Sequence, residues 1–90
     1  MAPLTRSEIR MRDGHVLQLN SERPDAILLG VTGLDRLAAK EPGLVRHLAE
    51  ALGRPQDPVV VERLVRALEK HVSHPEAAAA LERFRRRARR

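Results

Sequence analysis

The last eight residues, 83–90, read RFRRRARR and hold most of the chain's potential for binding chemistry. Each arginine carries a planar guanidinium that can donate two parallel hydrogen bonds to a phosphate or a carboxylate. On a helix that continues from Pro75, Leu81 and Phe84 share one side, and the arginines spread over the remaining arc. We therefore predict binding of nucleic-acid phosphates or of an acidic protein surface by six side chains: Arg83, Arg85, Arg86, Arg87, Arg89 and Arg90.

The net positive charge of the chain comes from this end alone. Residues 1–82 carry 11 basic and 12 acidic side chains, a net charge of −1, whereas residues 83–90 carry six arginines and no acid. A purely structural explanation also exists, because cations near a helix C-terminus offset the negative end of the helix dipole by about 0.3–1 kcal/mol. Six arginines exceed what that effect requires, which favours a binding role in addition to the structural one.

The other polar residues form no catalytic or metal-binding pattern. The chain has no cysteine, which excludes disulfides, thiolate nucleophiles and most structural zinc sites. His71 and His74 lie three apart without an evident third ligand, and His47 is distant in sequence. Nucleophile-elbow and glycine-rich phosphate-binding motifs are missing from the sequence. We predict a protein that is not an enzyme and that uses no cofactor and no metal.

The size of the chain predicts one small domain, 1–90, with an aliphatic core, because Phe84 is the only aromatic residue. Such a core is marginal for a monomer, so we expect a homo-oligomer that buries further surface. The longest apolar run, 77–81, is far shorter than the roughly 20 residues that cross a bilayer. No basic-then-apolar leader opens the sequence. We expect a cytoplasmic protein without a membrane partner.

Residues 6–20 alternate apolar and polar side chains on both sides of Asp13-Gly14, a pattern typical of a β-hairpin. A two-residue turn would put leucines opposite charged residues. A three-residue loop, 12–14, is therefore preferred, with Gly14 in the left-handed conformation. In that register four apolar side chains share one face: Ile9, Met11, Leu17 and Leu19.

Residues 24–82 change to the period of an α-helix. The first helix starts at Pro24, although Gly30 and Gly33 each weaken it by about 1 kcal/mol. A short strand over 26–31 followed by a helix from Leu34 stays open as the alternative.

Three further helices are indicated by their end signals. One runs from Pro42 to Gly53, with four residues facing inward: Leu44, Val45, Leu48 and Leu52. The next is capped by Asp57, and a Ser73–Glu76 capping box opens the last one. The predicted fold class is α+β: a β-hairpin at 6–20, a helical body at 24–82, and an arginine-rich helix end at 83–90.

Residues 44–72 resemble a helix-turn-helix unit, which implies DNA binding through the second helix. A recognition helix presents polar side chains from its first turns, whereas this one begins with Val59, Val60 and Val61. The connection at 53–58 is also longer than the usual three or four residues. We interpret the segment as a plain helical hairpin.

Two shorter resemblances also point to nucleic acid. Gly30-Val31-Thr32-Gly33 is similar to the G-x-x-G clamp of KH domains, but lacks the basic residue such loops carry between the glycines. The hairpin followed by residues 27–31 resembles the swapped-hairpin transcription factors of the AbrB type, in which basic strand residues face DNA in a homodimer. That resemblance implies a secondary contact through Arg10 and Arg12.

The sequence thus predicts a small, homo-oligomeric binding protein that contacts nucleic-acid phosphates through its arginine-rich C-terminal helix. The alternative is a structural or adaptor component of a larger phage-, secretion- or polymerase-type assembly, with the same helix docked on an acidic partner.

Overall fold

The computed structural model describes residues 3–88, and no strand occurs within this range. The predicted α+β class is therefore wrong, and the segment 6–20 is a helix rather than a β-hairpin. The described chain forms five α-helices and one 3-10 turn: α1 (Arg6–Leu19), α2 (Pro24–Leu37), η1 (Pro42–Leu44), α3 (Val45–Leu52), α4 (Pro58–Glu69) and α5 (Pro75–Ala88).

A capping box fixes the start of α1. The Thr5 hydroxyl accepts a hydrogen bond from the Glu8 backbone N–H at 3.1 Å, and the Glu8 carboxylate accepts one from the Thr5 N–H at 3.0 Å. These bonds satisfy two amides that a helix start leaves without partners. Lys40 also donates to the Glu8 carboxylate, at 3.0 Å. The Lys40 ammonium and then the Thr5 N–H hold the pKa of Glu8 below its ordinary value.

Three of the four residues of the predicted hairpin face, Ile9, Met11 and Leu17, are exposed in α1, which explains why the apolar spacing is misleading. The side that faces α2 carries Glu8, Arg12 and His15, all half-buried, and ends in the buried Leu19. Leu17 is 74% exposed. Apolar and polar residues therefore alternate along the chain while the helix packs through a largely polar stripe.

Two glycines let α1 lie close to α2. A Cβ at Gly30 would lie 2.6 Å from the backbone nitrogen of Leu19 and 2.7 Å from the carbonyl oxygen of His15. A Cβ at Gly33 would overlap the ring of His15. Gly30 and Gly33 thus allow α1 and α2 to cross in close contact. Residues 26–31 are part of helix α2, so the strand alternative for this segment is wrong.

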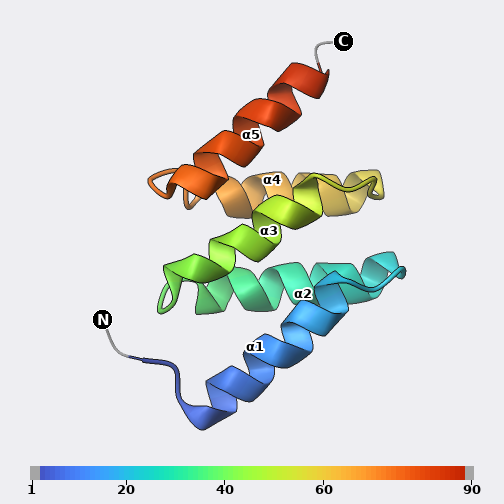
Figure 1. Ribbon diagram of the computed structural model, residues 1–90. Coiled ribbons are helices and arrows are strands. Elements are labelled where there is room, and N and C mark those ends of the chain that lie inside the picture. The colour runs from blue at the N-terminus through green and yellow to red at the C-terminus, as the bar shows by residue number, and fades with distance from the viewer. Residues whose placement is uncertain (1–2, 89–90) are drawn as a thin grey trace.

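The helices form two layers (Figure 1). A front layer holds α1, α3 and α5, which run in roughly the same direction, and a back layer holds α2 and α4. Helix α2 packs on α1 and α4, while α4 also packs on α3 and α5. The core between the layers is aliphatic, as predicted, and its largest fully buried side chains are Leu34, Leu48, Leu64, Leu68, Leu81, Val31, Val45 and Val60.

The predicted helices at 42–53 and after Asp57 are confirmed. The first begins as the turn η1 and continues as α3, and its four inward residues are all buried. Gly53 ends it, although with an ordinary φ of −75° rather than a left-handed one. The Asp57 carboxylate accepts a hydrogen bond from the Val59 N–H at 2.9 Å and so caps α4.

Helix α5 begins differently from the prediction. No hydrogen bond joins Ser73 to Glu76 in the described chain. The ring nitrogen Nδ1 of His74 accepts instead from the Glu76 backbone N–H, at 3.3 Å, and Pro75 is the first helical residue. The helix therefore has a histidine cap in place of the predicted capping box.

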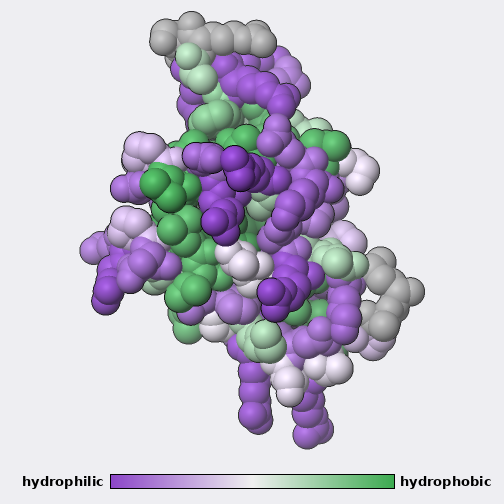
Figure 2. All heavy atoms as spheres, turned by 180° about the vertical axis from the view of Figure 1, so that it is seen from behind, coloured by the Kyte–Doolittle hydropathy of each residue, from purple (hydrophilic) through white to green (hydrophobic). Residues whose placement is uncertain are grey.

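The surface of the back layer is mainly hydrophilic, with hydrophobic side chains gathered along one side (Figure 2). Leu29 on α2 and Val59 on α4 are each 60% exposed. Across residues 3–88, every helix is too short or too polar to span a bilayer.

Candidate nucleic-acid interface

Helix α5 is attached to the body by a narrow apolar stripe. Ala77, Ala80 and Leu81 are buried, and Phe84 is half-buried against the core. Ala88, which the sequence places on the same side, is exposed. The docked part of the helix therefore ends about one turn before the described chain does. The end of α5 projects beyond α4 (Figure 1).

The four described arginines of α5 leave the helix in different directions, because successive residues turn by about 100°. Arg85 lines a groove of about 440 Å³ together with Val72 and Leu81. Arg83 lines a second groove of about 400 Å³ on the side of α3. The guanidinium groups thus surround the helix end and do not form one flat face.

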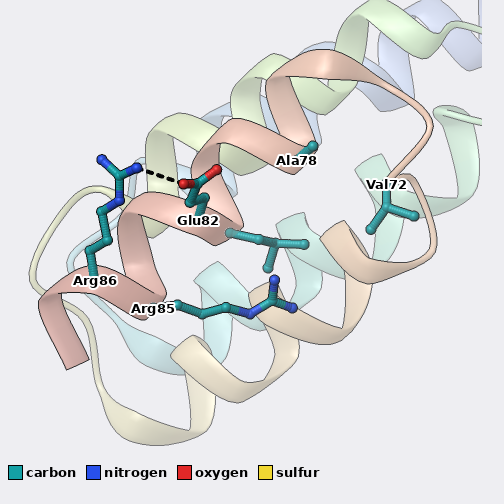
Figure 3. A pocket seen from close by; sticks show the side chains of 6 residues that line it. Val72, Ala78, Glu82, Arg85 and Arg86 are labelled. Atoms are coloured by element: carbon teal, nitrogen blue, oxygen red, sulfur yellow. Dashed lines mark hydrogen bonds and ion pairs between the residues drawn. The ribbon is translucent and has the colours of Figure 1, made fainter. Parts of the chain in front are cut away.

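Two of these arginines have partners within the protein. Arg86 donates to the Glu82 carboxylate at 2.6 Å, and Figure 3 shows it folded back onto that residue while Arg85 extends away from the pair. Arg87 donates to the carbonyl oxygen of Leu52 at 3.2 Å. Leu52 is the last residue of α3, so Arg87 satisfies a carbonyl at the negative end of that helix.

Arg83 and Arg85 are available for an external anion. Neither makes a hydrogen bond or an ion pair with another residue in the range 3–88, and both are exposed. Arg86 is also exposed, and its surface pair with Glu82 is worth only a few tenths of a kcal/mol. A phosphate can therefore compete for Arg86 at little cost, whereas Arg87 is committed to α3.

The remaining predicted contacts are not brought together with these residues. Arg89 and Arg90 lie outside the described residues. Arg10 and Arg12 are on α1, at the opposite end of the stack from α5 (Figure 1). Arg12 is also paired, with Asp13 at 3.2 Å and with Glu41 at 3.6 Å. Two positions apart on a helix differ by about 200°, so Arg10 and Arg12 do not face the same way, as they would on a strand.

One basic residue near this surface was missed. Arg46 of α3 lines the same groove as Arg83, with Glu50 and Glu76 on its rim. Its position next to the inward Val45 marks it as surface-facing, but only the packing of α3 on α5 places it beside the arginine end.

His71 and His74, three apart in the sequence, have different partners in the structure. The Nε2–H of His71 donates to the Asp35 carboxylate on α2 at 2.8 Å, and His74 caps α5. Each ring thus has a structural partner of its own. Within residues 3–88, no group of three or more histidine or acidic side chains is arranged to hold a metal ion.

Comparisons of this chain with protein-family models, with curated proteins and with solved structures gave no match.

Proposed function

We propose that this protein is a non-enzymatic binding protein whose arginine-rich helix end contacts nucleic-acid phosphates. Arg83, Arg85 and Arg86 are the described residues that make the contact. Arg89 and Arg90 extend the same basic segment in the sequence.

The observation that carries this proposal is the separation of charge from the body. All of the net positive charge falls in residues 83–90, and the body before it has a net charge of −1. The end of the helix that bears this charge projects beyond α4, so a long polyanion can approach it from several sides (Figure 1). A charge needed only to offset the dipole of α5 would not require this many residues.

The spread of the arginines favours contact with phosphates over the reading of bases. Base recognition needs several side chains aligned on one element that enters a groove. Here the exposed guanidiniums point around the helix, which suits non-specific contact with a backbone that carries regularly spaced charge.

Binding of a labelled DNA duplex at low salt tests the proposal. The variant R83A/R85A/R86A removes the three described contacts. The matched control, R6A/R10A/R36A, removes the same charge from exposed helical positions on α1 and α2. We expect the first variant to bind at least tenfold more weakly than the control. Equal affinities for the two variants would contradict the proposal.

The adaptor alternative is distinguished by the same proteins. If the arginine end docks on an acidic protein surface, the unmodified chain binds polyglutamate but not DNA at the same ionic strength. The proposal requires the opposite preference, because a DNA duplex carries about one negative charge per 1.7 Å of its axis and releases condensed counterions when cations bind it.

A further inference from the structure

The back layer has two helices and the front layer has three, so one side of α4 has no helical neighbour within residues 3–88 (Figure 1). A groove of about 640 Å³ lies there, between α4 and the end of α5. Its lining includes Pro58, Val61, Val65 and Glu69 of α4, and Phe84 of α5. Both valines and Phe84 are half-buried, so the floor of the groove is apolar.

Helix α2, the other helix of the back layer, has a helix packed on its corresponding side. Pro24 is the first residue of α2, and Pro58 is the first residue of α4. Counted from these prolines, Val31 of α2 corresponds to Val65 of α4. On α2 this side is covered by α4 itself, which runs alongside it in the same direction (Figure 1).

An acidic residue also occupies the same position in both helices. Asp35 of α2 and Glu69 of α4 hold the same place in their helices. Asp35 accepts from Lys70 and from His71, each at 2.8 Å, and these residues follow directly after α4. Glu69 makes no hydrogen bond or ion pair with another residue in the described range. Glu69 thus lies at the position in α4 that Asp35 has in α2, where Asp35 pairs with the basic residues that follow α4.

We propose that the groove beside α4 is a docking site for an amphipathic helix of a partner protein. That helix runs parallel to α4, covers Val61, Val65 and Phe84 with an apolar stripe, and carries Lys, Arg or His at its C-terminal end to pair with Glu69. The lining of this groove includes none of the α5 arginines, and its one arginine, Arg66, is paired with Glu62 at 3.1 Å. The inference does not rest on nucleic-acid binding.

The chain supplies its own probe for the test. A synthetic peptide with the sequence of residues 57–72 contains α4, its Asp57 cap and the basic Lys70–His71 end, which is the helix that fills the corresponding place beside α2. The full chain, labelled with ¹⁵N, is titrated with this peptide. We expect saturable shifts of amide signals at Val61, Val65, Glu69 and Phe84, without shifts at Val31.

Two protein variants assign the contacts. E69K should weaken peptide binding roughly fivefold, as expected for an exposed ion pair, and a peptide carrying K70E should recover part of the loss with this variant. F84A should weaken binding by removing the apolar floor. The control E22K reverses an exposed acid in the α1–α2 connection and should leave binding unchanged.

Three results would overturn the proposal. The first is the absence of saturable shifts at the groove. The second is the appearance of shifts at Val31 and Asp35, which would mean that the peptide displaces α4 from its own site. The third is a concentration-dependent shift of the same groove residues in the unmodified chain alone, which would make a second copy the occupant.

Discussion

Gly30 of α2 lies so close to the backbone of Leu19 in α1 that there is no room for a side chain at position 30. A Cβ at Gly30 would stand 2.6 Å from the Leu19 backbone nitrogen, well inside the shortest ordinary contact. Backbone atoms cannot rotate aside as the end of a long side chain can. Within residues 3–88, α1 packs on the back layer through α2, so the close approach at Gly30 is part of the interface that keeps α1 in place.

We predict that Gly30→Ala destabilises the protein. Alanine favours an isolated helix by about 1 kcal/mol over glycine, but overpacking against a neighbouring backbone costs typically 1–3 kcal/mol and here involves two close atoms. The net free energy of unfolding should fall by up to about 2 kcal/mol, measured by urea denaturation. An increase in stability would show that α1 does not cross α2 at this position.

The opposite result is expected for Gly14→Ala. Gly14 lies within α1, has no positive φ, and a Cβ there would have no neighbour within 4 Å. Alanine should therefore raise the free energy of unfolding by up to about 1 kcal/mol. A hairpin with Gly14 in the left-handed conformation would instead lose stability on this change, so the sign of the effect decides between the two structures of residues 6–20.

Most of the helical body could be predicted from the sequence, because its helices carry explicit end signals and apolar stripes. Asp57 followed by Pro58 defines the start of α4, and Gly53 marks the end of α3. The start of α1 also had a signal, the capping box of Thr5 and Glu8, but the alternation around Gly14 fitted a hairpin equally well. The helix could not be distinguished from the hairpin by hydrophobic periodicity, because α1 packs on α2 largely through polar side chains.

The candidate interface could be predicted only in part. The identity of the arginines and their place on a helix docked through Leu81 follow from the spacing. Their separate roles do not, because Arg87 and Leu52 are distant in sequence and meet only through the packing of α5 on α3. The groove beside α4 was not foreseen, since it depends on how many helices each layer holds.

Asp35→Asn should weaken the connection between α2 and the end of α4. Asp35 and His71 are about one-fifth exposed (19% and 20%), and the substitution removes the carboxylate that accepts from His71 and from Lys70. Lys70 is largely exposed, so its share is small. We expect a loss of about 1 kcal/mol and a fall in Tm of roughly 4–8 °C by circular dichroism. Asp25→Asn, which breaks the exposed pair with Arg23, is the control and should change Tm very little.

The Glu8 carboxylate should make part of the stability depend on acid pH. Its pKa in the folded protein lies below the ordinary value of 4.5, chiefly because Lys40 donates to it and then because of the Thr5 N–H. The contribution is therefore fully present above about pH 5 and is lost as the pH falls through the lowered pKa. The unmodified chain should lose more stability between about pH 6 and pH 3 than Glu8→Gln does, in urea denaturation at both values. Glu22→Gln, an exposed acid without a partner in the described chain, should lose as much as the unmodified chain; equal losses for all three would contradict the assignment.

The dependence of DNA binding on salt reports how many phosphates the arginines of α5 contact. If the exposed arginines of α5 neutralise phosphates, log K falls linearly with log salt, by about 0.9 for each phosphate contacted. The account predicts that R83A/R85A/R86A lowers this slope by about 2–3, while R6A/R10A/R36A leaves it near that of the unmodified chain. Equal slopes for all three proteins, or a slope lowered only by the substitutions on α1 and α2, would contradict the account.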